Sequence, residues 1–324
     1  MTLIEDSRIS KPHAATGETE GRTRYPWTLP KSYSNLGLHL GVALWLLAAG
    51  CGKSKAPIVV GSSSGTEQLL LGEIIAQHLE HSVQRKVERR FGLGGELITF
   101  QALSAGEITL YPDYTGSIEI GILKETPASD RDIILERTRR EMLRTAQLDV
   151  LDPLGYDNPP AMVVRTSDAD TGKIKTLSDA AAGAERWKLG VSYEFQQRGD
   201  AQPVINSYKL PLARGMQGMA AARLFPALQS GELNMLAVSA TDGNLDSPEF
   251  RVLTDDKQVL PPYIACLLVR HNAIVDEPQL RPALTQLSGK FTSDAVRKMN
   301  AEVDLKHRDP AGVAAEFLAS VGLK

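Results

Sequence analysis

Three polar turns between residues 60 and 117 carry the side chains best suited to bind a small polar molecule. The first is the Gly- and Ser-rich turn at residues 61–65, the second contains Gly94 and Gly95, and the third reads Tyr-Pro-Asp-Tyr-Thr-Gly at residues 111–116. Free backbone N–H groups at a helix start attract an anion, and tyrosine faces attract a cation. We therefore expect this block to direct helix starts and tyrosines at one cleft.

The first turn lies between a predicted strand and a predicted helix. Residues 56–60 form a short run rich in β-branched side chains, which is typical of a buried strand. Ser64 and Glu67 have the spacing of a capping box, in which each side chain accepts a hydrogen bond from the other residue's backbone N–H. The predicted helix runs from residue 65 to residue 80, and its expected apolar face consists of Leu70, Leu71, Ile74, Ile75 and Leu79.

Residues 61–65 also fit G-x-S-x-G, the nucleophile turn of serine hydrolases. In that interpretation Ser63 is the nucleophile and His271 or His307 is the general base. The turn follows the first predicted strand of the domain, however, so no earlier strand supplies an oxyanion loop. We keep a secreted serine hydrolase as an alternative and expect the chain not to be an enzyme.

An export signal is predicted at residues 1–50. Residues 36–50 are apolar apart from one His, and the run is short for a membrane span but typical of a signal-peptide core. Basic residues precede it, namely Arg22, Arg24 and Lys31. The run ends in Leu-Ala-Ala-Gly-Cys51, which resembles the bacterial lipoprotein signal, so we expect Cys51 to become the lipidated first residue and residues 51–56 to form a tether. The alternative is a buried N-terminal helix with an incidental Cys51.

The chain has 2 Cys residues and a formal net charge of −3 at pH 7. If Cys51 carries lipid, Cys266 has no partner, so we expect neither a disulfide nor a Cys-based metal site. We also expect no metal and no cofactor. Cys266 falls within a predicted strand at residues 264–270, where it would act as a small apolar side chain. The charge gives no reason to expect nucleic acid as a partner.

Strands and helices alternate along most of the remaining chain. Beyond the first block, strands are predicted at residues 161–165, 188–192, 233–239 and 264–270, with helices at 177–186 and 215–230 and a helical tail at 278–321. Such alternation predicts an α/β fold whose sheets have parallel strands.

The polar block resembles the first lobe of osmoprotectant-type (glycine betaine/choline) substrate-binding proteins of ABC importers. That family typically shows G-S-K-x-F-T-E-Q, then L-G-G-T, then L-Y-P-E-Y-T-G-T. The matching residues here are Gly61, Ser62, Thr66, Glu67, Gln68, Gly94, Gly95, Tyr111, Pro112, Tyr114, Thr115 and Gly116.

The resemblance implies a two-lobed periplasmic-binding-protein fold of type II, with two hinge crossings and a ligand cleft between the lobes. The first lobe is expected at residues 57–157 plus 263–324, and the second at residues 158–262. Open α/β sheets bind ligands outside the C-terminal ends of their strands, so we expect the ligand there.

The resemblance also implies which side chains contact the ligand. Family members that bind quaternary ammonium compounds use an aromatic cage, and two of its tyrosines match Tyr114 and Tyr263. Arg198 matches a cleft arginine that would hold a carboxylate in a planar, bidentate grip. The other implied contacts are Ser63, Ser64, Thr66 and Ser117.

Two further cage positions are not aromatic in this sequence. Pro160 replaces one tyrosine, and Ser239 or Ala240 replaces another. Each lost cation–π contact removes about 1–2 kcal/mol, and a total of about 2–4 kcal/mol corresponds to roughly 30- to 1,000-fold in affinity. We therefore predict weak glycine betaine binding and a carboxylate-bearing or polar ligand, unless Tyr156 or Tyr193 rebuilds the cage.

These features together favour an extracytoplasmic, lipid-anchored solute-binding protein of an ABC importer. Its expected partners are a small quaternary ammonium or carboxylate-bearing solute, an ABC permease and ATPase, and the membrane that holds the lipid. The chain contains no Walker A sequence, so other subunits would power transport. A ligand sensor that works without a permease is the remaining alternative.

Overall fold

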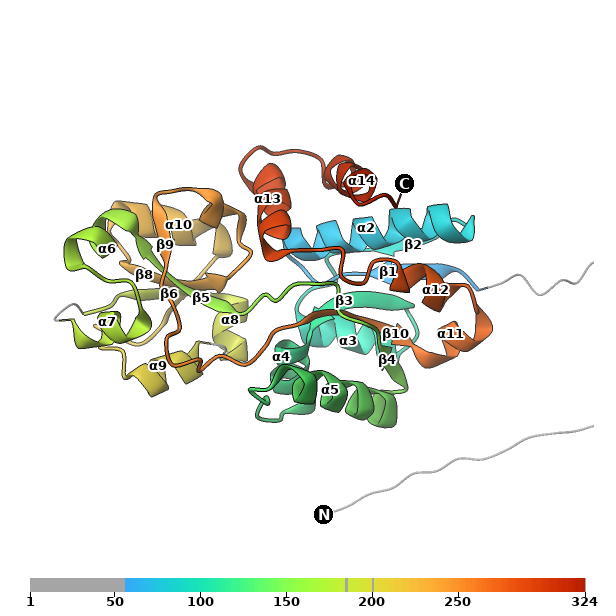
Figure 1. The fold of residues 1–324 in the computed structure, drawn as a ribbon, viewed down its shortest axis with the longest axis horizontal. Coiled ribbons are helices and arrows are strands. Elements are labelled where there is room, and N and C mark those ends of the chain that lie inside the picture. Colours follow the sequence, from blue (N-terminus) through green and yellow to red (C-terminus); the bar gives the residue numbers. More distant parts are fainter. Residues whose placement is uncertain (1–55, 184–185, 200, 324) are drawn as a thin grey trace, which may run out of the picture. The chain divides into compact units, whose positions relative to one another are not determined.

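The computed structural model describes residues 56–183, 186–199 and 201–323, which contain two five-stranded sheets (Figure 1). The predicted export signal and Cys51 lie outside these residues. None of the helices in the described part is both long enough and apolar enough to cross a membrane.

The first sheet consists of five short strands, and helices connect those that run parallel to one another. Its strands, in spatial order, are β2 (Val87–Arg90), β1 (Ile58–Gly61), β3 (Leu110–Tyr114), β10 (Ala265–Arg270) and β4 (Leu148–Val150). β1 pairs in parallel with β2 and β3, whereas β10 pairs antiparallel with β3 and β4. We call this sheet and its helices the first lobe.

The second sheet repeats the same spatial order with a different set of strands. These are β7 (Gln217–Met219), β6 (Leu189–Ser192), β8 (Met235–Ser239), β5 (Pro160–Arg165) and β9 (Phe250–Val252). β6 pairs in parallel with β7 and β8, and β5 pairs antiparallel with β8 and β9. We call this sheet and its helices the second lobe.

The prediction of parallel sheets is therefore wrong for one strand in each lobe. The chain passes between the sheets twice, after β4 and again before β10 (Figure 1). β5 and β10 are the first strands after these two passages. Each therefore enters its sheet from the other lobe and not through a crossover helix, which is the connection that makes neighbouring strands parallel. β1 and β6 run parallel to both of their neighbouring strands, as the alternation of strands and helices predicts.

Helices cover both faces of the first sheet because alternate strand residues point to opposite faces. Val60 and Leu267 pack with the first layer of helices, whereas Val59 and Leu268 pack with the second. The first layer consists of α2 (Thr66–Val83), α12 (Leu280–Thr285), α13 (Ser293–Asp304) and α14 (Pro310–Ser320). The second consists of α3 (Glu96–Ser104) and α5 (Arg131–Ala146). Three short helices complete the first lobe: α4 (Thr115–Ser117), η1 (Ile118–Leu123) and α11 (His271–Asp276).

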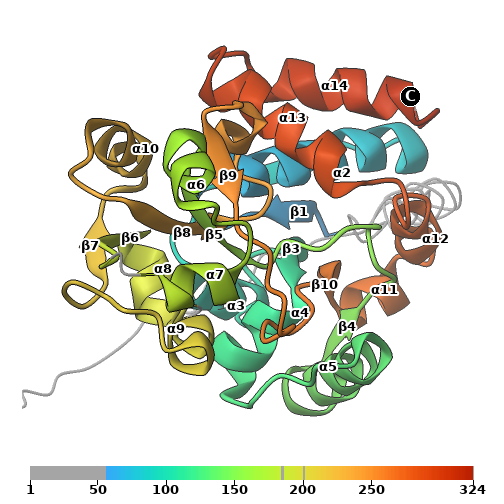
Figure 2. The same cartoon turned by 60° about the vertical axis from the view of Figure 1, so that its left-hand side comes forward.

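The second lobe has the same layered arrangement (Figure 2). Met162 and Val164 of β5 face one layer, and Ala161 and Val163 face the other. The first layer contains α6 (Thr166–Gly172), α7 (Leu177–Ala182), α8 (Tyr193–Arg198) and α9 (Gln202–Tyr208). The opposite face is covered by α10 (Ala221–Ser230), and the short helix η2 (Gly243–Asp246) follows β8.

Two local predictions need correction. The helix expected at residues 215–230 begins only at Ala221, because residues 217–219 form β7 at the sheet edge. The predicted capping box is absent: Gly65 is the N-cap of α2, and no side chain caps it. The Glu67 carboxylate instead accepts hydrogen bonds from distant segments, so tertiary partners override the local cap. The predicted apolar face of α2 is buried as expected.

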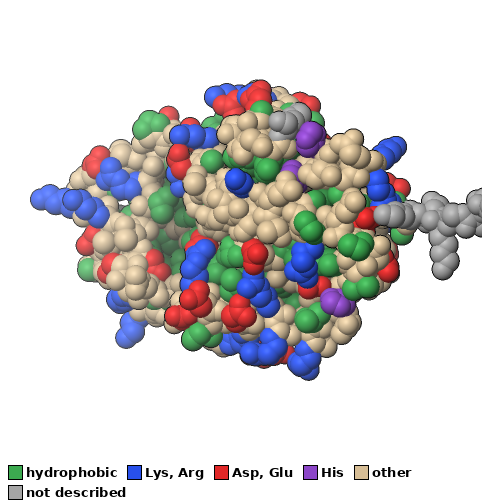
Figure 3. All heavy atoms as spheres, turned by 45° about the vertical axis from the view of Figure 1, so that its right-hand side comes forward, with side chains coloured by type: hydrophobic (Ala, Val, Ile, Leu, Met, Phe, Trp, Pro, Cys, Tyr) green, Lys and Arg blue, Asp and Glu red, His purple; other side chains and the backbone are tan. Residues whose placement is uncertain are grey.

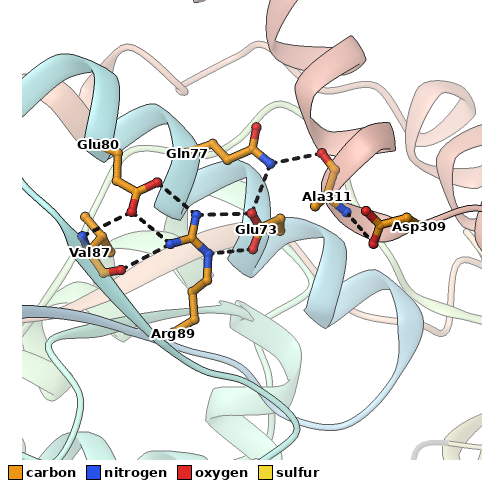
Figure 4. A network of polar contacts seen from close by, with 7 residues as sticks. All are labelled: Glu73, Gln77, Glu80, Val87, Arg89, Asp309 and Ala311. Atoms are coloured by element: carbon orange, nitrogen blue, oxygen red, sulfur yellow. Dashed lines mark hydrogen bonds and ion pairs between the residues drawn. The ribbon is translucent and has the colours of Figure 1, made fainter.

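β2 is an edge strand, and a charged network fixes it to α2 (Figure 4). Arg89 donates to Glu73 at 2.8 Å and to Glu80 at 2.9 Å, and this interaction lowers the pKa of Glu80. Gln77 extends the network by donating to the backbone oxygen of Ala311 in α14 at 2.9 Å. Charged side chains on an edge strand also oppose pairing with another chain.

Candidate ligand-binding site

A cavity of about 1040 Å³ is lined by residues of both lobes. Its wall begins where parallel strands end: Ser63 follows β1, Tyr114 ends β3, Ser192 ends β6 and Ser239 ends β8. The carboxyl ends of parallel strands meet at one edge of each sheet, so turns from both lobes converge on one space.

Most of the predicted contact residues lie on this wall. Those that line the cavity are Ser63, Ser64, Thr66, Tyr114, Ser117 and Tyr263. Arg198 is the last residue of α8, and its side chain lies outside the part of the structure that is described. The sequence thus identified a set of residues that the fold brings together from three separate segments.

Tyr114 and Tyr263 are both held by close contacts. The Tyr114 hydroxyl donates to the Glu67 carboxylate and accepts from the Gln68 side chain at 3.1 Å. Tyr263 is 2% exposed and packs against Gly116, where an added Cβ would lie 2.8 Å from the ring. The Tyr-Thr-Gly sequence therefore needs its glycine to let the second tyrosine approach.

The two replaced cage positions face each other across a strand pair. Pro160 of β5 pairs with Ser239 of β8, and both line the cavity. Neither predicted substitute lines it in the described structure. Tyr156 is 3% exposed and packs edge-on against Tyr114 from the protein interior, whereas Tyr193 is 59% exposed.

Other aromatic side chains, which no sequence pattern indicated as contacts, line the second lobe's part of the wall. They are Phe195, Phe225 and Phe250. Phe225 and Phe250 contact each other edge-to-face, with ring centroids 4.8 Å apart. Phe195 lies three residues before Arg198, so its place beside a predicted contact residue was a usable signal. No local pattern distinguished Phe225 or Phe250 from ordinary core residues.

Acidic groups predominate among the charged side chains that line the cavity. Five carboxylates contribute to the wall, those of Glu67, Glu96, Asp113, Asp242 and Asp304. Among the described side chains Lys124 is the one basic group there. Burial raises the pKa of Asp242, with Asp304 and Glu67 adding to the effect. Elsewhere acidic and basic side chains are mixed on the face shown in Figure 3.

Some of these carboxylates already have partners within the protein. Asp113 accepts from the Tyr111 hydroxyl and from the backbone N–H of Tyr114, each at 2.8 Å. Asp304 accepts from the Thr66 hydroxyl beside the start of α2. The described residues contain no group of three or more His, Cys, Asp or Glu side chains arranged to hold a metal ion.

Comparison with known proteins identifies the family. Residues 56–320 match the family described as the substrate-binding domain of the ABC-type glycine betaine transport system. The chain belongs to this family. The match extends over both lobes and confirms the resemblance noted in the sequence.

Individual relatives agree with this assignment. An ergothioneine transport permease/ergothioneine binding protein from Helicobacter pylori is 30% identical over 300 residues, covering 90% of this chain but only 53% of that protein. The carnitine transport binding protein OpuCC from Listeria monocytogenes is 27% identical over 270 residues, covering 82% of this chain and 87% of the relative. The crystal structure of a glycine betaine/carnitine/choline ABC transporter aligns with a TM-score of 0.71 at 25% identity, over 82% of this chain and 99% of that one.

The family confirms the predicted two-lobed α/β binding-protein fold and the absence of an enzymatic role. The hydrolase alternative also lacks a suitable base in the described structure. Ser63 lines the cavity, but neither His271 nor His307 does. His271 instead contacts Asp149 at 2.8 Å through Nδ1.

Proposed function

We propose that this chain is the solute-binding protein of an ABC importer and that its ligand is a small quaternary ammonium compound. The composition of the cavity wall supports this proposal most directly. Tyrosine and phenylalanine side chains from both lobes line the same space as five carboxylates. Aromatic faces attract a desolvated cation, and a cleft of one charge sign concentrates ligands of the opposite sign.

The ligand contacts that we propose combine the two lobes. Tyr114 and Tyr263 would contact the ammonium group, while Ser63, Ser64, Thr66 and Ser117 would bind polar groups of the solute. Arg198 remains our candidate for holding a carboxylate. The sequence led us to expect an anion at the start of α2. Three carboxylates lie near that helix start, those of Glu67, Asp242 and Asp304. Their charges oppose an anion there and favour a cation.

The relatives supply the chemical class to test. Their names refer to carnitine and to ergothioneine, and both compounds join a trimethylammonium group to a carboxylate. Glycine betaine is the smallest such compound, and choline carries the same cation without the carboxylate. We expect at least one of these four compounds to bind and glycine betaine to bind weakly, because Pro160 and Ser239 leave part of the cage without an aromatic face.

A thermal-shift screen tests the proposal, since a ligand that binds only the folded state raises the melting temperature. The four compounds are compared with 3,3-dimethylbutan-1-ol, in which carbon replaces the charged nitrogen of choline. Stabilisation by an ammonium compound but not by the neutral isostere is the expected result. Equal stabilisation by choline and the isostere, or stabilisation by none of the four compounds, would contradict the proposed ligand class.

We further propose that the protein works outside the cytoplasm, held to a membrane by lipid on Cys51. The proposal is supported by the basic flank, the apolar run at residues 36–50 and the Ala-Ala-Gly-Cys sequence. The first strand of the described domain starts at Ile58, so only a short tether would separate the anchor from the first lobe. A permease and an ATPase would be the partners that move the solute.

A further inference from the structure

The Glu67 side chain accepts hydrogen bonds from several segments that are far apart in sequence. Its Oε1 atom accepts from the Tyr156 hydroxyl at 2.7 Å, from the Asn158 amide at 3.2 Å and from the Tyr114 hydroxyl. Its Oε2 atom accepts from the Asn300 amide at 2.9 Å and from the Thr241 hydroxyl. One carboxylate thus satisfies five donors.

These five donors come from both lobes and from the segment between them. Tyr114 ends β3, and Asn300 lies in α13 of the first lobe. Tyr156 and Asn158 lie where the chain passes from β4 to β5. Thr241 belongs to the second lobe, in the turn between β8 and η2. Glu67 is therefore bonded to both lobes and to the segment that connects them.

Thr241 is held through all of its polar atoms by residues outside the second sheet. Its hydroxyl donates to Glu67, its backbone N–H donates to the Asn158 side chain at 3.2 Å, and its carbonyl accepts from Asn300 at 2.8 Å. The side chain is fully buried. This residue consequently attaches the second lobe to Glu67, Asn158 and Asn300.

Close packing near Thr241 also attaches the second lobe to α13 of the first lobe. Gly243, at the start of η2, lies so close to α13 that an added Cβ would be 2.6 Å from the backbone nitrogen of Ala301. The Arg297 guanidinium of α13 donates to the carbonyl of Ala240 at 3.2 Å. In Figure 1, α13 lies between the body of the first lobe and the second lobe. The turn after β8 therefore rests on α13 as well as on Glu67.

The chemistry of this cluster requires an acceptor at Glu67. Burial, followed by the nearby Glu67 charge, raises the pKa of Tyr114 and of Tyr156 well above the ordinary value, so both hydroxyls stay protonated and donate. A carboxylate offers two acceptor oxygens, whose lone pairs the five donors share, whereas a glutamine offers one oxygen and adds two N–H groups. The Tyr114 ring, held in this cluster, also lines the cavity.

We propose that Glu67 is a positioning residue that fixes the pivot about which the two lobes turn. By binding Thr241 on one side and Tyr114 on the other, it couples the orientation of the second lobe to the wall of the cavity. The predicted effect of Glu67 on the orientation of the lobes does not depend on the identity of the ligand. Its predicted effect on the rate of ligand release rests on the proposed function.

Thr241→Val tests the pivot, and Thr138→Val is its matched control. Thr138 is also fully buried and also donates to a buried carboxylate, that of Glu119 at 3.2 Å, but both residues belong to the first lobe. Small-angle X-ray scattering of the full-length, ligand-free proteins reports the orientation of the lobes. We expect a larger radius of gyration for Thr241→Val and an unchanged one for Thr138→Val.

Two further variants keep the test decisive. Thr241→Ser retains the hydroxyl and is expected to scatter like the wild type. Glu67→Gln is expected to enlarge the radius of gyration as Thr241→Val does, and it replaces that variant if Thr241→Val does not fold. Wild-type scattering by both Thr241→Val and Glu67→Gln would overturn the proposal, as would the same change in Thr138→Val.

Ligand release provides a second readout with choline, carnitine, glycine betaine or ergothioneine as the probe. Thr241→Val should release the bound probe several-fold faster than the wild type, and Thr138→Val should release it at the wild-type rate. Equal release rates in the two variants would contradict the coupling. A protein that binds none of the four probes would contradict the proposed function and leave the scattering test in force.

Discussion

Gly116 and Tyr263 depend on each other although 147 positions separate them in the sequence. The ring of Tyr263 occupies the space that a side chain at Gly116 would need, since an added Cβ would lie 2.8 Å from two ring atoms. Gly116→Ala should therefore displace the ring and lower the free energy of unfolding by about 1–3 kcal/mol through overpacking. Urea denaturation measures this change.

Gly312→Ala is the control for that substitution. Gly312 is exposed near the start of α14, and an added Cβ would meet no atom within 4 Å. Alanine favours a helix over glycine by up to about 1 kcal/mol, so this variant should be neutral or slightly more stable. Equal destabilisation by the two substitutions would show that the Tyr263 contact is not the cause.

At the scale of elements, His78 connects α2 to α12 in the interior of the first lobe. It is fully buried, and its Nε2 atom lies 2.8 Å from the carbonyl of Ala283. Burial lowers the pKa of His78 below its ordinary value of 6.5, although nearby backbone carbonyls oppose the shift. The unfolded chain thus binds a proton more readily than the folded protein as the pH falls below 6.5.

His78 should therefore contribute stability that is present above pH 6.5 and is lost as the pH falls toward the lowered pKa. Each unit of pKa difference corresponds to about 1.4 kcal/mol. Urea denaturation at a series of pH values should show a smaller loss of stability for His78→Gln than for the wild type over this window. The control His307→Gln changes an exposed residue and should leave the pH dependence as it is. An unchanged slope in His78→Gln would refute this assignment.

At the level of the whole molecule, the lipid anchor proposed at Cys51 would hold the two lobes at a membrane surface outside the cytoplasm. We expect the protein extracted from the membranes of its native host to lack residues 1–50 and to carry lipid on Cys51. Intact-mass measurement gives both results at once. Cys51→Ala should abolish the lipid mass, while Cys266, which is fully buried in β10, cannot replace it. A native protein that retains residues 1–50 would disprove the anchor.

Features that depend on neighbouring residues could be predicted from the sequence. Periodicity located most strands and the buried face of α2, because side-chain spacing fixes which residues share a face. The Gly-Ser and Tyr-Thr-Gly turns led to the cavity because the ends of parallel strands converge. Family resemblance added Tyr263, which no local pattern distinguishes.

Features that depend on distant partners could not be predicted from local patterns and became visible in the folded chain. Glu67 has the spacing of a helix cap, yet it binds five donors that lie between 47 and 233 positions away. The direction of β5 and β10, and the presence of Phe225 and Phe250 on the cavity wall, likewise follow from how the chain passes between two sheets. A carboxylate accepts whichever donors the fold brings within reach, and five tertiary donors, most of them buried, outweigh one local cap because an unsatisfied buried donor is costly.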